Sequence, residues 1–389
     1  MKYHIPHKKN SSITTQVVCA VLFVLFAFSW LYWFQADLLA VAQHTLSGGV
    51  TRYDRTVGAV LITAVLVLVQ RVVVAVTRLF GRTHALTYGP SMMALALMGD
   101  MSVGSDHQLS FASCRWAVLV ALVMWVGLVW MAKKVLPFGA GKEQSGLFSR
   151  RVWINALLMV AMMVAVAAVS NTHAVLHFRA HAEVALSKGD TAEALRVGNR
   201  SHETDESLTM LRVYALSRSG QLGDRLFSYP LKGTGSDIVP TGDSRSRLLL
   251  LSADSLWRHL GARPKSGMGT RRYLQALEGD TMGTRAVADY VLCAALIDRD
   301  LDAFVGALSR FGLLGDSTAD ALPRHYREAL ILYTHQRSHP VTVYHHAVMD
   351  EDWDNLQELE QRHADAPGRK TAVRERYAGS YWYYYFYNK

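Results

Sequence analysis

The positive charge of this chain is confined to its first 172 residues, and this asymmetry constrains the fold more than any other feature. The chain carries a formal net charge of +9. Residues 1–172 contain 14 lysines and arginines against 5 acidic residues, whereas residues 173–389 contain 27 of each sign. The first part also holds long apolar runs, and the second has the composition of a water-soluble domain. This division predicts a transmembrane domain over 1–172 and a domain outside the bilayer over 173–389.

The location of the charge excludes a nucleic-acid-binding role. The surplus lies in short segments beside apolar runs, where it orients membrane proteins. The balanced second part lacks the positive field that phosphate binding requires. Of the three cysteines, Cys19 and Cys114 fall in or beside apolar runs and Cys293 stands alone, so no disulfide framework is expected in the second domain. We therefore expect the lipid bilayer as a partner and no nucleic acid.

Five apolar segments are predicted to cross the membrane, at about 13–34, 57–76, 83–103, 114–131 and 152–172. The first follows Lys2, Lys8 and Lys9, as in a signal peptide. Because its apolar run is long and has no clear small-x-small cleavage site, we expect an uncleaved anchor. The few polar residues within the spans, mainly Gln70, Arg71 and Asn155, favour an anchoring role for this domain.

The third segment is short for a span. Ala85–Gly99 would reach only about 22 Å as a helix, against a hydrocarbon core of about 30 Å. If it crosses, the basic segment 132–151 stays on the side of the amino terminus; if it does not, that segment must be translocated. The positive-inside rule therefore favours five spans, a cytoplasmic amino terminus and a periplasmic second domain on a bacterial inner membrane.

A short pattern recurs in the second domain, with a small apolar pair, a polar turn and a renewed apolar helical period. It begins at Ala185, Ala215, Ala295 and Ala347. Antiparallel helix pairs joined by tight turns have this pattern, and the first spacing of 30 residues is close to the tetratricopeptide (TPR) period. We predict an all-α chain whose second domain is a TPR-like α-solenoid of about five hairpins, with degenerate repeats.

Two segments rich in Gly, Pro and Ser interrupt this pattern, at Leu231–Ser246 and Gly261–Arg271. Their composition predicts loops without helix. Long loops in a helical array serve either as binding elements or as flexible connections. The sequence leaves these alternatives open.

Several stretches resemble an uncharacterised family of bacterial multi-span inner-membrane proteins with a carboxyl-terminal TPR-like domain of unknown function. The stretches are LRVYALSRSGQLGDRLFSYP (211–230), LPRHYREALILY (322–333), SYWYYYFY (380–387) and the block 35–70 that contains SGGVTRYDRTVGAVL. The resemblance implies a fold and a location. It implies no activity.

His173, His177 and His181 recur at every fourth position and fall on one helix face after the last span. Neutral imidazoles at this spacing can share a metal ion, which makes these three residues weak candidates for a metal site. Only Glu183 offers a nearby carboxylate, and an interfacial polar stripe explains the pattern as well. We therefore predict no metal and no cofactor.

Two runs read D-x-D-x-D, as calcium loops begin. They are Asp298, Asp300, Asp302 and Asp350, Asp352, Asp354. Both lack the glycine and the bidentate glutamate that complete an EF-hand. Both coincide with the turns of the repeat pattern, so we expect helix capping.

His345 and Asp350 have the H-x-x-x-x-D spacing of some acyltransferases, in which the histidine acts as a base. Chance explains such a pair in a chain with 16 histidines. The chain has no P-loop, nucleophile elbow, dinucleotide fingerprint or H-E-x-x-H motif. We identify no catalytic residue and lean against an enzyme.

Four acidic residues flank the spans on the side opposite the amino terminus: Asp37, Asp54, Asp100 and Asp106. Acids within a membrane serve proton or cation relays in some proteins. These four can reach water, so their position at the ends of the spans is the simpler explanation.

Seven consecutive aromatic residues lie near the end of the chain: Tyr381, Trp382, Tyr383, Tyr384, Tyr385, Phe386 and Tyr387. Exposed, this run would promote aggregation. It must pack within its own domain, insert at the membrane surface or contact a partner, and as a functional site we predict contact with a partner or membrane.

Together these features predict a membrane-anchored scaffold or assembly component that binds a protein or peptide through its periplasmic domain. The alternative is a membrane enzyme or transporter that acts on a lipid-linked or glycan substrate, with the helical domain as an accessory.

Overall fold

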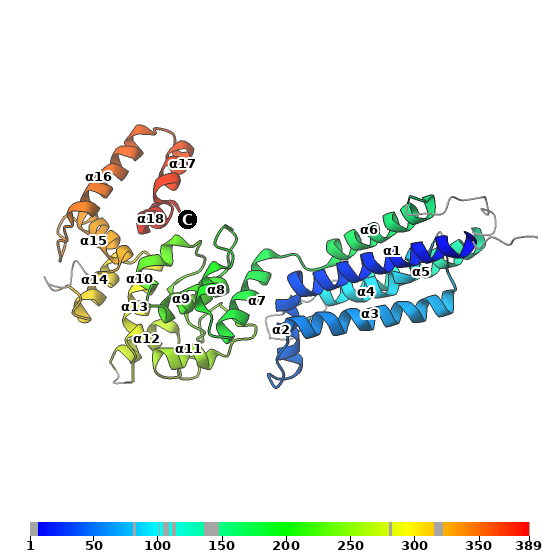
Figure 1. Cartoon of the computed structure of the whole chain (residues 1–389). Coiled ribbons are helices and arrows are strands. Elements are labelled where there is room, and N and C mark those ends of the chain that lie inside the picture. Colours follow the sequence, from blue (N-terminus) through cyan, green and yellow to red (C-terminus); the bar gives the residue numbers. More distant parts are fainter. Residues whose placement is uncertain are drawn as a thin grey trace, which may run out of the picture. The chain divides into compact units, whose positions relative to one another are not determined.

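The computed structural model describes residues 7–80, 83–100, 102–103, 109–110, 114–135, 148–279, 282–314 and 322–388. The chain divides into two compact units, Met1–His173 and Ala174–Lys389, one residue beyond the division expected from charge. Within the described residues, the regular elements of both units are helices, apart from one pair of two-residue strands (Figure 1).

The first unit is a bundle of long apolar helices. Its elements are α1 (His7–Ser29), η1 (Trp30–Phe34), α2 (Ala36–Leu46), α3 (Arg55–Thr77), η2 (His84–Tyr88), α4 (Gly89–Gly99), β1 (Ser102–Val103), β2 (Leu109–Ser110), α5 (Cys114–Val135) and α6 (Arg150–Val169). Within the described residues, four helical segments are long and apolar enough to cross a membrane: Ile13–Phe34, Arg55–Thr77, Trp116–Lys134 and Arg150–Val169. They correspond to four of the five predicted spans.

The third predicted span, 83–103, is not one continuous helix. The segment consists of the 3₁₀ helix η2 and the short α-helix α4. Pro90 in the first turn of α4 explains the division, because proline starts a helix readily and cannot continue one from the preceding turn. The larger rise of the 3₁₀ turn brings the length of the two parts to about 26 Å.

The two-part segment nevertheless runs along the bundle in parallel with α6. At its start, the N–H of Ala85 donates to Oδ1 of Asn155 at 2.7 Å, near the beginning of α6. At its end, the carbonyl of Gly99 accepts from the N–H of Asn171 at 2.9 Å, just past the end of α6. The chain therefore returns through the bundle between α3 and α5 (Figure 1).

Helix α3 runs in the opposite direction to this segment. Nε2 of Gln70 donates to Oγ1 of Thr87 at 3.0 Å. One turn further on, the hydroxyl of Ser91 in α4 donates to the carbonyl of Leu66 at 2.8 Å. The indole of Trp125 in α5 donates to the carbonyl of Leu86 at 2.7 Å. These bonds hold α3 and α5 against η2 and α4 from two sides.

The second unit is an array of shorter helices. Its elements are α7 (Ala174–Ser187), α8 (Thr191–Arg196), α9 (Glu206–Arg218), α10 (Leu222–Arg225), η4 (Leu226–Ser228), η5 (Gly235–Ile238), α11 (Ala253–Leu260), α12 (Thr270–Glu278), α13 (Ala286–Ile297), α14 (Leu301–Arg310), α15 (Arg324–Gln336), α16 (Ala347–Arg362), α17 (Ala366–Tyr377) and α18 (Tyr381–Tyr387). The first three repeat motifs form the turns α7–α8, α9–α10 and α13–α14, as the pattern predicts. The turn predicted after Ala347 is wrong, because α16 continues through it.

Helix α9 lies at the centre of this unit, and every residue from Ser207 to Leu216 is buried. It packs against α7, α8, α10 and η5. Helix α15 is also largely buried, and it contacts α10 and α18 besides its neighbours α14 and α16. These contacts between elements distant in sequence go beyond the nearest-neighbour pattern of a solenoid.

The loop Leu231–Ser246 is part of the core. It contains the 3₁₀ helix η5, and its residues Ile238 and Val239 are fully buried. The buried carboxylate of Asp237 accepts hydrogen bonds from the N–H of Thr234 (3.0 Å), the N–H of Arg245 (2.8 Å) and the guanidinium of Arg245 (2.8 Å). The expectation of a loop without helix is therefore wrong here, since η5 fills the space beside α9, α12 and α13.

The second loop, Gly261–Arg271, is bonded to the first. The N–H of Gly242 donates to the carbonyl of Met268 at 3.0 Å, and the N–H of Thr270 donates to the carboxylate of Asp243 at 2.8 Å. Thr270 also opens α12, so the last two residues of the predicted loop are helical. The two loops thus stabilise each other.

A second buried carboxylate fixes the chain before α11. Glu183 in α7 is fully buried and accepts hydrogen bonds from the successive N–H groups of Leu249, Leu250 and Leu251 at 2.7–2.9 Å. Burial raises the pKa of Glu183 above its ordinary value, and the three N–H bonds oppose that rise.

We predict that Asp237→Asn destabilises the second unit in a pH-dependent way. Desolvation alone would raise the pKa of Asp237, but the hydrogen bonds from Arg245 and Thr234 outweigh it and hold the pKa below its ordinary value. Such a carboxylate stabilises the fold above its unfolded pKa of about 3.9, and this contribution is lost as the pH falls through the lower folded value. Denaturant unfolding of the full-length protein should show a loss of about 2 kcal/mol at pH 7.

The difference between the two proteins should shrink as the pH falls below about 4. The exposed Asp254 provides the control, and Asp254→Asn should change stability by less than about 0.5 kcal/mol. A pH-independent loss for Asp237→Asn would show that the ionised carboxylate is not the stabilising form.

Candidate functional site

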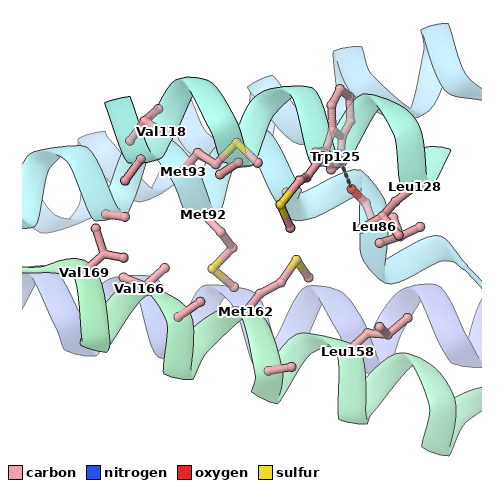
Figure 2. A pocket seen from close by; sticks show the side chains of 17 residues that line it. Leu86, Met92, Met93, Val118, Trp125, Leu128, Leu158, Met162, Val166 and Val169 are labelled. Carbon is pink, nitrogen blue, oxygen red and sulfur yellow. Dashed lines mark hydrogen bonds between the residues drawn. The ribbon is translucent and has the colours of Figure 1, made fainter. Parts of the chain in front are cut away.

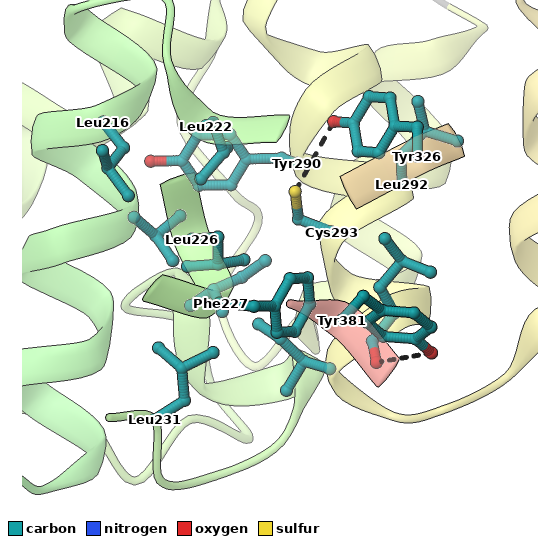
Figure 3. Close-up of a cluster of buried hydrophobic side chains, with 14 of the residues drawn as sticks. Leu216, Leu222, Leu226, Phe227, Leu231, Tyr290, Leu292, Cys293, Tyr326 and Tyr381 are labelled. Atoms are coloured by element: carbon teal, nitrogen blue, oxygen red, sulfur yellow. Dashed lines mark hydrogen bonds between the residues drawn. The ribbon is translucent and has the colours of Figure 1, made fainter. Parts of the chain in front are cut away.

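The aromatic run near the end of the chain forms helix α18 and packs against α15. Tyr381, Trp382 and Tyr384 are buried. Their polar tips are all bonded within the unit: the hydroxyl of Tyr384 donates to the carbonyl of Ile297 at 2.8 Å, and the indole of Trp382 donates to the carbonyl of Glu328 at 2.7 Å. Figure 3 shows Tyr381 beside Phe227, with ring centroids 4.9 Å apart.

The carboxylate of Glu328 anchors α18 on α15. It is buried, and it accepts hydrogen bonds from the N–H of Tyr381 (2.7 Å), from Nδ1 of His325 (2.9 Å) and from Nε of Arg324 (2.8 Å). The N–H of Tyr381 belongs to the first turn of α18, where a negative charge is favourable. Ser380 completes this end by accepting the N–H of Tyr383 at 3.2 Å.

A second buried cluster surrounds Cys293 (Figure 3). Its thiol lies 3.5 Å from the hydroxyl of Tyr326, which donates to the carboxylate of Asp289 at 2.9 Å. Burial raises the pKa of the Cys293 thiol far above its ordinary value, and burial also raises the pKa of Asp289. The Cys293 side chain is fully buried and packs within this cluster.

The aromatic run is thus divided between core and surface. Tyr381, Trp382 and Tyr384 fill the core beneath α15, which is the packing within the run's own domain that the sequence left open. Four members remain partly exposed: Tyr383, Tyr385, Phe386 and Tyr387. Contact of these four with a partner or the membrane stays a prediction.

Exposed valines lie near the carboxyl-terminal end of α15. Val341 and Val343 are 89% and 58% exposed, and Val348 in the first turn of α16 is 62% exposed. The N–H of Val341 donates to the hydroxyl of Tyr333 at 3.3 Å, which places the segment against the last turns of α15. The hydroxyl of Tyr385 donates to Oε1 of Gln336 at 3.1 Å and so brings α18 to the same end. We call Val341, Val343, Val348, Tyr385 and Phe386 the α15-end surface.

The weak metal candidates do not form a site in the described structure. His181 pairs with Glu193 of α8, with Nε2 and Oε1 3.2 Å apart. Nothing described brings His173 and His177 to a shared centre with it, and no group of three His, Cys, Asp or Glu side chains in the described residues is arranged to hold a metal ion.

The first aspartate run caps a helix as expected. Asp300 is the N-cap of α14 and accepts the N–H of Ala303 at 2.9 Å. Asp298 instead accepts the N–H of Gly235 at 2.8 Å, and Asp302 forms an ion pair with Arg337.

The second aspartate run differs from the prediction. Asp352 and Asp354 lie inside α16, and the N-cap is His346, whose Nδ1 accepts the N–H of Met349 at 3.4 Å. Asp350 accepts the N–H of His346 at 3.0 Å and so closes this cap from the first turn. His345 does approach Asp350, with Nδ1 and Oδ2 3.6 Å apart, but its side chain is 71% exposed and forms no enclosed site.

The acidic residues of the first unit have structural partners. Asp37 lies 3.6 Å from the guanidinium of Arg55, and Asp54 is the N-cap of α3, accepting the N–H of Thr56 and of Val57 at 2.9 and 2.8 Å. Asp100 is buried just after α4. Asp106 lies outside the described residues. These contacts agree with acids that flank the helices.

Comparison with known proteins finds one likeness. Residues 270–388 match the model of a family of unknown function, DUF6057. The match covers α12 to α18 and therefore includes Glu328, Cys293 and the α15-end surface. The resembling stretches 322–333 and 380–387 lie inside it, and 211–230 and 35–70 lie outside. No curated protein and no solved structure matches the chain.

The sequence did not single out two features of this region. Glu328 reads as an ordinary helical glutamate, and only its position facing the aromatic run reveals its role. The valines of the segment HPVTVYHHAV alternate with polar residues, a pattern that predicts a half-buried strand. The exposure of Val341 and Val343 could not be foreseen from it.

We predict that Glu328→Ala releases α18 from α15. The substitution leaves the N–H of Tyr381, the imidazole of His325 and the guanidinium of Arg324 without their shared acceptor, which should cost about 3 kcal/mol. Limited proteolysis and thermal unfolding of the full-length protein in mild detergent measure the effect.

Glu358→Ala is the matched control, because Glu358 pairs with Arg362 at 2.8 Å on the exposed face of α16. An exposed pair of this kind is worth less than about 1 kcal/mol. Equal losses for the two variants would show that Glu328 does not anchor α18.

Proposed function

We propose that this chain is a membrane-anchored scaffold or assembly component that binds a protein or peptide partner through its second unit. The observation that supports this function best is the α15-end surface. Its three valines are more than half exposed, Tyr385 and Phe386 of α18 are partly exposed, and Tyr385 is bonded to Gln336 at the end of α15.

Exposed apolar patches on otherwise polar domains are typical of protein interaction sites. Tyrosine and phenylalanine supply large contact areas at low entropic cost, which suits the centre of an interface. The unit around this surface is held by buried carboxylates, so the valines and rings are presented on a rigid base. A TPR-like mode of recognition belongs to this proposal.

The proposed location is a bacterial inner membrane, with the amino terminus in the cytoplasm and the second unit in the periplasm. The course of η2 and α4 supports five passages through the bundle. The bundle end where α5 ends and α6 begins carries Lys133, Lys134, Arg150 and Arg151, whereas the other end carries Asp37, Asp54 and Asp100. The positive-inside rule assigns the first of these ends to the cytoplasm.

We predict that a periplasm-dependent alkaline phosphatase fused after Lys389 is active, and that the same reporter inserted between residues 135 and 148 is inactive. Cytoplasmic reporters at these two positions should give the opposite result. Five passages of the chain place Lys389 in the periplasm and residues 135–148 in the cytoplasm, whereas four passages reverse both locations. The reversed pattern, with activity between residues 135 and 148 and none after Lys389, would contradict the proposed topology.

We predict that a stoichiometric protein partner copurifies with the full-length protein from native membranes after chemical crosslinking. The triple variant Val341→Ser, Val343→Ser, Val348→Ser should reduce its recovery by about tenfold, because burial of exposed valine side chains stabilises such interfaces. Quantitative mass spectrometry provides the measurement.

Met282→Ser is the control, since Met282 is 61% exposed in the same unit and lies outside the α15-end surface. Recovery of the partner should remain unchanged in this variant. Undiminished recovery with the triple variant would remove the α15-end surface from the proposal.

The alternative function is a membrane enzyme or transporter that acts on a lipid-linked or glycan substrate. One observation favours it, an apolar groove between α4, α5 and α6 in the first unit. The polar side chains near that groove, Gln70, Thr87 and Asn155, are engaged in hydrogen bonds within the bundle.

A further inference from the structure

A groove of about 320 Å³ runs between α4, α5 and α6 (Figure 2). Apolar side chains line it, with Met92 and Met93 from α4, Trp125 from α5, and Met162 and Val166 from α6. Methionine side chains are flexible and polarizable, so they adapt to a partner of variable shape. The groove therefore combines an apolar surface with an adjustable wall.

Trp125 of α5 forms part of the wall of the groove and contacts η2 and the start of α4. The indole of Trp125 donates to the carbonyl of Leu86 and occupies the space above Gly89. A Cβ atom at Gly89 would lie only 2.4 Å from Cδ1 of Trp125, so glycine is required there. Beyond Trp125, the facing residues Ala121 and Ala161 have short side chains and leave the volume open.

The size of the groove decides what kind of molecule fits. A further transmembrane helix is about 10 Å in diameter and would enter the groove only with the side chains of one face. An alkyl chain of roughly ten methylene groups, each about as large as a water molecule of about 30 Å³, fills the available space. Water itself is disfavoured, because the lining offers almost no hydrogen-bonding partners.

The groove opens sideways, toward the surroundings of the bundle. Met124 and Leu128 of α5 line it and are 61% and 42% exposed. Ala161 and Ala165 of α6 also line it and are exposed. At this depth in a membrane protein, the surrounding solvent is lipid hydrocarbon, which reaches the groove without passing through the protein.

One end of the groove lies close to a concentration of positive charge. Leu128 is six residues before Lys134, and Leu158 is seven residues after Arg151, which corresponds to about 9–11 Å along α5 and α6. Lys133 adds a further charge in the last turn of α5. Clusters of basic residues of this kind attract anionic lipid headgroups.

We propose that the groove binds one acyl chain of an anionic phospholipid from the surrounding bilayer, with its headgroup held by Lys133, Lys134 and the arginines at the start of α6. This inference goes beyond the scaffold function and does not depend on the α15-end surface. Binding here fixes α5, the long helix with the smallest buried share, against the rest of the bundle.

The test uses full-length protein in phosphatidylcholine nanodiscs that contain a small fraction of phosphatidylglycerol with a photoactivatable diazirine on its acyl chain. After illumination, crosslinks should concentrate on groove residues of α4, α5 and α6, several-fold above those on the exposed face of α3. Unlabelled phosphatidylglycerol should compete more strongly than unlabelled phosphatidylcholine. Uniform labelling of all exposed helices, or equal competition by the two lipids, would overturn the proposal.

Two tryptophan substitutions on α6 form a matched pair. Ala161→Trp fills the groove and should reduce crosslinking about tenfold, whereas Val160→Trp, at a position 49% exposed outside the lining, should change it less than about twofold. Thermal unfolding checks that both variants fold. Equal crosslinking in the two variants would overturn the proposal.

The headgroup contact is tested separately with the double variant Lys133→Gln, Lys134→Gln. In this variant the two unlabelled lipids should compete about equally, whereas crosslinks at the groove should persist. An unchanged preference would contradict the assignment of these lysines. In samples prepared from native membranes, recovery of a protein segment crosslinked to groove residues would show that a partner helix occupies the groove. That result would refute the inference.

Discussion

The membrane unit depends on how the backbone of η2 is satisfied where water is scarce. A 3₁₀ turn followed by a proline-started helix leaves backbone groups without partners inside the segment, and each unsatisfied group in lipid costs several kcal/mol. Three long helices supply the missing hydrogen-bond partners. Asn155 of α6 accepts the N–H of Ala85, Trp125 of α5 donates to the carbonyl of Leu86, and Gln70 of α3 supports the segment through Thr87. The irregular segment is thus stable only in the middle of these helices, and it determines how they are arranged.

The second unit uses buried carboxylates for a comparable purpose. Glu183, Asp237 and Glu328 each accept backbone N–H groups from a segment that lies elsewhere in the chain or at the other end of a loop. Removing a charge from water is costly, and this cost is offset only where several donors converge on the same group. Each carboxylate therefore stabilises one arrangement of its segment and disfavours the others. Apolar packing alone would specify the same segments less strictly.

The sequence was most informative where one local rule decides the structure. Four long apolar spans and the turns after Ala185, Ala215 and Ala295 follow from hydropathy and helix-capping chemistry. The division of 83–103 into η2 and α4 could not be foreseen, because charge asymmetry indicates how often the chain crosses the membrane and says nothing of the type of helix in each crossing. The prediction of a turn after Ala347 was wrong. Acidic residues occur both in tight turns between helices and near the start of a helix, and the sequence pattern does not distinguish the two. The aromatic run shows the remaining gap: its partners, Glu328 and the carbonyls of Leu296 and Ile297, lie 53 to 87 residues away.

The burial of α9 on all sides has a consequence for how this unit can change during evolution. Arrays of stacked repeats gain or lose whole repeats by duplication and deletion, because each repeat covers only its neighbours. Here, deletion of the hairpin formed by α7 and α8, or of the segment around η5, would uncover a helix that has no exposed face between Ser207 and Leu216. Helix number in this unit is therefore constrained, and diversification is directed to surface segments such as the one that connects α15 with α16.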